Sequence, residues 1–348
     1  MKSLEKTALQ KLQLPHRLIS MIRQIGESKG KQELYQNQAP EMLENLRQIA
    51  VIQSTESSNR LEGITADHKR IKDLVEENTT PSNRSEAEIA GYRDVLNTIH
   101  SNSKNIPFSD RVVLQLHRDL MKYTEKEGGR WKSVPNEISE ILQDGTKRIR
   151  FVPVEPVKTP QYMHDLHEKF SELINRQSFD PLVLIPLFIL DFLCIHPFLD
   201  GNGRMARLIS VLLLYHNDYE VARYISLERI IEQSNESYYD SLFQSSQGWH
   251  ESSHNVLPWM EYYLATILAA YREFENRVET VSSGHGSKTD MVVSAIDGFI
   301  GDFSMSDLER ACPAVGRDWL RKLLQRMKNE GKLEALGKGR YAKWRKIQ

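Results

Sequence analysis

The segment HPFLDGNGRMAR, residues 196–207, is a polar loop between two strongly apolar runs. The run before it, PLVLIPLFILDFLCI at 181–195, is shorter than the roughly 20 residues that a bilayer-spanning helix needs, and it contains Asp191. The run after it, RMARLISVLLLYH at 204–216, is also mostly apolar. We therefore expect two buried helices joined by this loop.

Helical periodicity continues on both sides of this region, so the fold class that we expect is mainly α. Apolar residues spaced three and four apart predict helices at 42–61, 86–99, 109–121 and 159–173. One segment differs, because residues 137–152 contain two strand-like runs around Asp144-Gly145, a dipeptide suited to a tight turn. We expect one β-hairpin there.

The composition limits the class of protein. The chain has 348 residues with 46 basic and 47 acidic side chains, so no overall field attracts it to nucleic acid or an anionic membrane. Its two cysteines, Cys194 and Cys312, lack metal-ligand spacing and argue against a disulfide scaffold. The N-terminus lacks the continuous apolar stretch of a secretory signal. These features predict a cytoplasmic protein.

The C-terminal part differs in character. The segment VSSGHGSK at 281–288 predicts a linker, and the order of helical and strand-like runs in 288–348 resembles a winged helix-turn-helix. That part holds 13 basic and 8 acidic side chains, an excess suited to DNA phosphates. The alternative is that Arg317, Arg321 and their basic neighbours are the solvated face of a dimerisation or protein-docking module, which leaves a homodimer open.

The loop at 196–207 carries the features of an anion site. Gly201, Asn202 and Gly203 let the backbone turn sharply, and amides that open onto a helix are favourable anion donors. Arg204 and Arg207 are three residues apart, so both guanidinium groups can face one anion. Two arginines suit a polyphosphate.

Two further side chains of the loop fit phosphoryl chemistry. Asp200 offers a carboxylate oxygen to Mg²⁺ that also binds phosphate oxygens. His196 titrates near physiological pH when unperturbed, and so suits a general base that removes a proton from a hydroxyl group. The alternative for His196 is a histidine buried in the core for structural reasons.

The nine fixed positions of His-Pro-Phe-x-Asp-Gly-Asn-Gly-Arg-x-x-Arg are all present, and this segment resembles the signature of the Fic family of AMP-transferring enzymes. Residues 116–121 (LHRDLM) and 129–131 (GRW) also look like segments that precede this signature, so the resemblance covers roughly 85–250. It implies a helical domain with one β-hairpin flap. It also implies ATP as substrate and Mg²⁺ as cofactor.

The resemblance assigns roles to the loop. His196 would be the base that activates the target hydroxyl, and Asp200 would be the Mg²⁺ ligand. The nucleotide would be bound by Gly201, Asn202, Gly203, Arg204 and Arg207.

Segments outside the loop take roles by the same resemblance. The hairpin would be a flap that holds a target segment by strand-like pairing through Ile149, Arg150 and Phe151. Asn235 and Tyr239 would lie on the nucleoside side of the site. The alternatives are an ordinary surface hairpin and tyrosines that pack in the core.

Upstream, STESSNRLEGI resembles the inhibitory motif of the family, with Ser58, Glu62 and Gly63 at its fixed positions. On a helix Ser58 and Glu62 would share one face, and Glu62 would pair with Arg207 and remove an anchor of the γ-phosphate. A solvated glutamate at a helix end is the alternative.

We therefore expect three parts: a helical region with the inhibitory helix at 1–84, a Fic catalytic domain at 85–280, and a winged-helix-like domain at 288–348. The expected function is transfer of AMP from Mg-ATP to a Ser, Thr or Tyr hydroxyl of a protein, with self-modification included and with Glu62 as inhibitor. One alternative is removal of AMP by the same site. Another is a DNA-binding transcriptional regulator that senses nucleotide. The sequence does not identify the target protein or the trigger that releases Glu62.

Overall fold

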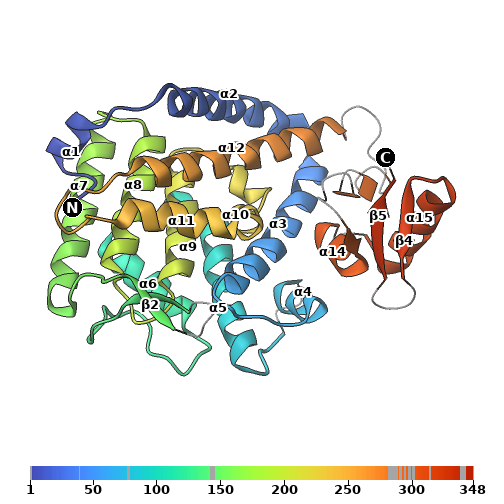
Figure 1. Cartoon of the computed structure of the whole chain (residues 1–348), viewed down its shortest axis with the longest axis horizontal. Helices are drawn as coiled ribbons and strands as arrows, with labels where there is room; N and C mark the ends of the chain where they lie inside the picture. The colour runs from blue at the N-terminus through green and yellow to red at the C-terminus, as the bar shows by residue number, and fades with distance from the viewer. Residues whose placement is uncertain are drawn as a thin grey trace.

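The computed structural model describes residues 2–38, 40–76, 79–141, 146–280, 289, 292–293, 295–296, 299, 302–312, 315–337 and 342–347. This part of the chain is mainly α-helical, as predicted, with two small antiparallel sheets (Figure 1). None of its helices is long and apolar enough to span a bilayer.

The helices are α1 (Lys6–Lys11), α2 (His16–Gln38), α3 (Pro40–Arg60), α4 (His68–Glu76), α5 (Arg84–Asn102), α6 (Asp110–Leu120), α7 (Thr159–Asn175), α8 (Pro181–Ile195), α9 (Asn202–His216), α10 (Leu227–Gln233), α11 (Asn235–Ser246), α12 (Leu257–Thr280), α14 (Met305–Ala311) and α15 (Arg317–Asn329). The strands are β1 (Ile138–Ile141), β2 (Lys147–Phe151), β3 (Phe303–Ser304), β4 (Leu333–Leu336) and β5 (Lys343–Lys346).

The predicted helices lie close to their expected bounds because polar caps begin them. The side chain of Asn83 accepts from the main-chain N–H of Glu86 at the start of α5, and Ser109 caps α6 in the same way. Asp180 caps α8, whose first residue is Pro181, the position where a missing N–H costs least.

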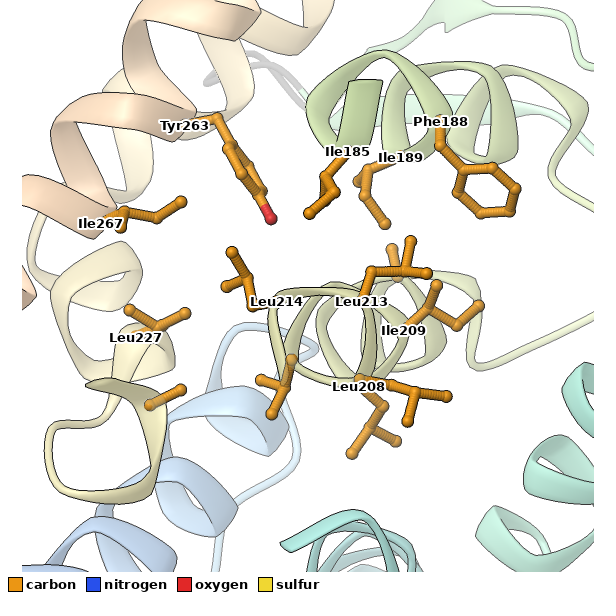
Figure 2. Packing of buried hydrophobic residues seen from close by; sticks show 14 of the residues in the cluster. Ile185, Phe188, Ile189, Leu208, Ile209, Leu213, Leu214, Leu227, Tyr263 and Ile267 are labelled. Carbon is orange, nitrogen blue, oxygen red and sulfur yellow. The ribbon is translucent and has the colours of Figure 1, made fainter. Parts of the chain in front are cut away.

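Helices α8 and α9 form the centre of the molecule. Every residue of α8 after Pro181 is buried, and so is nearly every residue of α9, which explains why both sequences are apolar on all faces. In Figure 2, Ile185 and Ile189 of α8 and Leu213 and Leu214 of α9 point into one cluster with Tyr263 of α12. The loop between these helices therefore has a rigid support on both sides.

The charged residue inside α8 has a specific set of partners. Asp191 is fully buried and accepts hydrogen bonds from the N–H (3.1 Å) and hydroxyl (2.5 Å) of Ser3 and from Nε1 of Trp249 (2.7 Å). These bonds satisfy a carboxyl group that would otherwise be costly to bury. Asp191 thus ties the N-terminal segment to the central helix.

The N-terminal helices share the main core with the central region. Leu18 and Ile25 of α2 belong to the same buried cluster as α8 and α9. Figure 1 shows α2 lying along α12, and Gln24 accepts a hydrogen bond of 3.0 Å from Arg272 between them. Helix α3, which carries the predicted inhibitory motif, therefore packs inside the fold.

The hairpin is present, with β1 paired antiparallel to β2 and a bulge between Ile138 and Ser139. Its predicted turn, Asp144-Gly145, lies outside the described residues. The described strands are shorter than the expected 137–152.

The C-terminal part has a second core of its own, to which Val292, Ile296, Leu320 and Leu324 contribute. Its sheet has the order β3-β5-β4, with α14 and α15 packed against it (Figure 1). The Gln53 amide of α3 donates a hydrogen bond of 3.0 Å to the carbonyl of Arg310, which joins this part to the inhibitory helix. The predicted linker at 281–288 lies outside the described residues.

Candidate active site

The loop between α8 and α9 is built on two left-handed residues. His196 ends α8 with φ 51° and ψ 61°, and Gly201 precedes α9 with φ 79°. A left-handed glycine is ordinary, but a left-handed histidine is uncommon and needs support from its surroundings. Part of that support is Asn202, whose buried side chain accepts from the N–H of Phe198 (2.9 Å) and donates to its carbonyl (2.8 Å). Its backbone amide, rather than its side chain, is therefore what Asn202 offers to an anion.

His196 has the protonation state of a base. Its Nδ1 lies 3.3 Å from the carbonyl oxygen of Leu193, and because a carbonyl only accepts, Nδ1 carries the hydrogen. Burial lowers the pKa of His196 to about 4, so the ring is neutral at physiological pH. Nε2 then carries a lone pair that can accept a proton.

A second histidine holds the loop. The Nδ1 atom of His117 accepts the N–H of Gly129 (2.9 Å), so its Nε2–H donates to the carbonyl of Asp200 (3.1 Å). Its ring stacks on Phe198 with centroids 3.7 Å apart. Burial lowers the pKa of His117 to about 4, which keeps this arrangement of one donor and one acceptor.

Asp200 belongs to a network of charges that the sequence did not predict. It forms ion pairs with Lys126 and, at 3.5 Å, with Arg204. The buried carboxylate of Glu88 on α5 accepts from Arg204 (2.9 Å) and lies 3.4 Å from Lys126. Burial alone would raise the pKa of Asp200, but Lys126 and Arg204 hold it below its ordinary value. Asp200 is therefore a charged carboxylate at the start of α9.

Arg204 retains unused hydrogen-bonding capacity. Its side chain is 1% exposed, and its Nε and Nη1 atoms are buried without a hydrogen-bond partner in the described part of the chain. Buried donors are normally satisfied, and an unpaired guanidinium edge is suited to an anion. The carboxylates of Glu88 and Asp200 both lie at its Nη2 atom and leave the edge formed by Nε and Nη1 open.

Arg207 is bound by the predicted inhibitory motif. Its Nε donates to the hydroxyl of Ser58 (2.8 Å), and its Nη2 donates to the carbonyl of Ser58 (2.9 Å) and to Glu62 (2.8 Å). Burial opposes the charged form, yet Glu62 raises the pKa of Arg207 above its ordinary value. Ser58 and Glu62 thus engage Nε and Nη2 of the guanidinium group.

The backbone at the end of α3 explains the spacing of this motif. The helix ends at Arg60, so Glu62 lies just beyond it. The sequence had instead suggested that Glu62 shares a helix face with Ser58. The N–H of Ile64 bonds to the carbonyl of Asn59 and that of Gly63 to Arg60, which is a Schellman turn. Gly63 has φ 74°, the conformation that this turn requires and that glycine adopts without strain. The turn aims Glu62 at Arg207.

The carboxylate of Glu62 lies at the beginning of α9. A Cβ atom placed on Gly203 would be 2.2 Å from Oε1 of Glu62, so only glycine permits this approach. The N-terminus of a helix attracts anions. Glu62 therefore occupies the place where the geometry would receive another anionic group.

Of the two residues predicted for the nucleoside side, Tyr239 contacts the inhibitory motif and Asn235 is exposed. Tyr239 on α11 donates its hydroxyl to the carbonyl of Leu61 (3.0 Å), so it contacts the inhibitory motif. Asn235 is exposed at the start of α11, one turn away. Arg60 adds an ion pair of 2.7 Å with Glu232 of α10. The structure thus brings Tyr239, but not the side chain of Asn235, to Leu61.

The three flap residues lie on β2 beside the site. Ile149 is exposed, Arg150 pairs with Glu140 (3.2 Å), and Phe151 stacks on His250. Within the described residues β2 has β1 as its strand partner on one edge only. A free edge can accept an extended peptide.

The carboxylates present fit a metal that is shared with a ligand. The described residues contain no group of three or more His, Cys, Asp or Glu able to hold a metal ion. Mg²⁺ is often bound by one or two carboxylates together with substrate phosphates. Asp200, a charged carboxylate beside an anion site, meets that requirement.

Sequence reasoning missed five residues whose side chains contact the loop: His117, Glu88, Lys126, Lys132 and Asn136. Each of them lies far from the loop in the sequence, and no local pattern marks their contacts with it. His117 was quoted within a motif, but without a role.

Comparison with known proteins agrees with this architecture. Residues 107–214 match the profile of the Fic/DOC family. A Fic family protein from Desulfovibrio desulfuricans G20 is similar in structure, with 22% identity, a TM-score of 0.60 and 97% of each chain covered. A Fic domain containing signaling protein from Bacteroides thetaiotaomicron VPI-5482 has 22% identity and a TM-score of 0.61, over 76% of this chain and 98% of that one. Fic-1 (aa134–508) from C. elegans has 19% identity and a TM-score of 0.57, over 74% and 71%.

Proposed function

We propose that the protein transfers AMP from Mg-ATP to a Ser, Thr or Tyr hydroxyl of a protein, and the match of residues 107–214 to the Fic/DOC family supports this proposal. The observation that carries this proposal is the neutral His196, whose free Nε2 lies in a loop that leads directly into the anion site at the start of α9. We place this activity in the cytoplasm.

The transfer follows from these groups. The target hydroxyl oxygen attacks the α-phosphorus of ATP while its proton passes to Nε2 of His196. A new oxygen–phosphorus bond forms, the bond from the α-phosphorus to the bridging oxygen breaks, and pyrophosphate leaves. His196 then releases its proton to solvent. Because its pKa is low, His196 is unprotonated and ready for each turnover.

The phosphates would be held by Arg204, Arg207 and the amides of Gly201, Asn202 and Gly203. Arg204 supplies an unpaired guanidinium edge in the described part of the chain, and Arg207 becomes available when Glu62 leaves. Asp200 would hold Mg²⁺, which supplies charge neutralisation of the phosphates when bound.

The target and the nucleoside would bind on either side of the loop. The free edge of β2, with Ile149, Arg150 and Phe151, would pair with an extended target segment and place its hydroxyl in line. Asn235 and Tyr239 of α11 would lie against the nucleoside.

We propose that Glu62 is an inhibitor of this reaction. Its carboxylate lies against Gly203 and binds Arg207, so it competes with the phosphate that would use the same donors. Ser58 and Gly63 support it, the first by a second bond to Arg207 and the second by the turn after α3. The resting protein would bind ATP in an unproductive way.

The test is incubation of the wild-type protein and its Glu62→Gly and His196→Ala variants with ATP and Mg²⁺, followed by intact-mass analysis of the protein itself and of lysate proteins. An AMP-sized addition that grows in Glu62→Gly and is lost in His196→Ala supports transfer, and an addition on the chain itself supports self-modification. No addition in any variant that binds ATP refutes the proposal.

Removal of AMP is a second candidate for the same site. The observation that favours it is the position of Glu62 at the beginning of α9, from which its carboxylate can orient a water toward a bound phosphate. Incubation with a protein already carrying AMP separates the two, because removal would require Glu62 whereas transfer would be inhibited by it.

We also propose, as a separate role, that the C-terminal part binds DNA as a winged helix-turn-helix. Helix α15 exposes Arg321, Lys322 and Arg326, and a groove of about 730 Å³ lies between it and Trp344 of β5. Phosphate-driven binding falls steeply with salt. Binding to duplex DNA that weakens tenfold or more between about 50 and 200 mM salt would support this role, and no binding at low salt would favour protein docking or a homodimer.

A further inference from the structure

The segment before the flap is bonded to the catalytic loop in a regular way. Two of its residues, Lys132 and Asn136, donate to every main-chain carbonyl from 195 to 198. The four bonds run from Lys132 Nζ to Ile195 (3.0 Å), Asn136 Nδ2 to His196 (3.2 Å), Lys132 N to Pro197 (2.8 Å) and Asn136 Nδ2 to Phe198 (2.9 Å).

These carbonyls need partners. They follow the end of α8, where the last carbonyls of a helix lose their intrahelical donors. They also surround His196, whose left-handed backbone is strained and persists only where its surroundings hold it in place. The bonds to the carbonyls of Ile195 and of His196 itself fix the two peptide planes that set its φ and ψ.

Lys132 and Asn136 act as one unit. Lys132 is buried, and its Nζ donates to the side-chain oxygen of Asn136 (2.8 Å), which orients the amide so that its Nδ2 faces the loop. Burial lowers the pKa of Lys132 to about 8, so at pH 7 the ammonium group is still charged and donates. Asn136 is separated by one residue from β1, the first strand of the flap. The unit therefore connects the flap to His196.

We propose that Lys132 and Asn136 are positioning residues that hold His196 in its left-handed conformation and connect it to the flap. This inference rests on the proposed function of His196 as the base. The two residues touch neither nucleotide nor target in this account; they act through the backbone of the loop.

The test uses Asn136→Asp in the Glu62→Gly background. Aspartate keeps the volume and the contact with Lys132 but cannot donate to the carbonyls of the loop. The matched control is Asn217→Asp, because the amide of Asn217 also donates to a main-chain carbonyl (Leu213, 2.8 Å) but at the far end of α9. Two readouts are made: kcat and KM for ATP, and the ¹⁵N NMR signals of the His196 ring across pH.

We expect Asn136→Asp to lower kcat by about 10- to 100-fold, since a shift of about 1 Å in a reacting group costs up to about 100-fold. KM for ATP should stay within about twofold, because binding is not affected. The tautomer or pKa reported by the His196 signals should change, and Asn217→Asp should change none of these. Unchanged His196 signals in Asn136→Asp would overturn the proposal, even if kcat falls.

A second pair of variants keeps the test decisive if Asn136→Asp is unstable. Lys132→Met removes the bond to Ile195 and a positive charge near His196, so it should raise the pKa of His196. Lys132→Arg keeps a positive charge and should leave that pKa near its wild-type value. If no variant transfers AMP, the NMR readout still decides: shifted His196 signals would keep the positioning unit and refute only the proposed function.

Discussion

The contact between Glu62 and Arg207 allows a quantitative prediction. The perturbation is Glu62→Gly, with Glu62→Gln as a variant that keeps the shape and removes the charge. Glu62 accepts one charge-assisted hydrogen bond from Arg207. Such a bond is worth about 1.5–3 kcal/mol, roughly twice the value of a bond between neutral groups. At about 1.4 kcal/mol per tenfold change, full removal corresponds to roughly a 10- to 150-fold gain in productive ATP binding.

The exposure of the pair places the value in the lower part of that range. The side chain of Glu62 is 33% exposed, whereas that of Arg207 is 4% exposed, so water screens one partner only. We expect the transfer rate to rise roughly 10- to 30-fold in Glu62→Gly and roughly three- to sixfold in Glu62→Gln. Ser58→Ala removes the acceptor of Arg207 Nε but leaves Glu62 in place. It should therefore raise the transfer rate less than Glu62→Gly or Glu62→Gln does.

Glu62→Gly should lower the free energy of unfolding by less than the full value of the hydrogen bond to Arg207, so stability is measured beside activity. Glu62 follows the end of α3, where the helix dipole disfavours a carboxylate by about 0.3–1 kcal/mol, and this offsets part of the lost ion pair. The assay is the initial rate of AMP incorporation at saturating ATP, with thermal unfolding of each variant as control. The reasoning is refuted if folded Glu62→Gly transfers AMP no faster than wild type, or if Glu62→Gln equals Glu62→Gly.

Three further predictions concern packing, metal binding and pH. Gly91→Ala should destabilise the protein by about 1–3 kcal/mol or more, because the new Cβ would lie 2.0 Å from a main-chain oxygen of α6. Gly30→Ala in α2 has open space around it and should stabilise the protein by about 0.5–1 kcal/mol. Urea unfolding of the two variants measures both changes. Lys126→Met should lower the Mg²⁺ concentration for half-maximal activity about two- to fivefold, since the metal no longer competes with an ammonium group for Asp200, and an unchanged value would contradict this. Burial lowers the pKa of His100 to about 3 from an unfolded value near 6.5, so below pH 6.5 the unfolded state binds a proton that the folded state does not, and stability falls as the pH falls. His100→Gln should reduce the stability lost between pH 6.5 and 5.5 by about 1 kcal/mol. Urea unfolding at both pH values measures this difference.

Much of the fold could be predicted because its signals are local. The apolar run of α8 and the apolar periodicity of α5 and α6 predicted these helices to within three residues, since such patterns depend on neighbours within one or two turns. The hairpin was expected for the same reason. The end of α3 was predicted to within one residue, at Leu61 against the observed Arg60, but the turn after it, which requires Gly63, was not predicted.

The chemistry of the candidate site was also partly local. The loop at 196–207 brings a base, a carboxylate, flexible amides and two arginines together by sequence order alone, so its residues could be named without a fold. Their protonation states and hydrogen-bond partners could not be predicted in this way. Whether His196 is neutral and which of its nitrogens is free depends on burial and on the carbonyl of Leu193, which only packed helices bring about.

The sequence by itself determined which elements form and which residue types surround the loop, because helix periodicity, caps and turn chemistry act between near neighbours. Tertiary structure alone decided which distant groups complete the site. Glu88, Lys126, Lys132 and Asn136 reach it from segments at least 60 residues away, and no short-range pattern specifies such contacts. The physical reason is that an ion pair or hydrogen bond between remote residues forms only after the α8–α9 core has fixed both backbones, and the energy of that core is spread over many side chains.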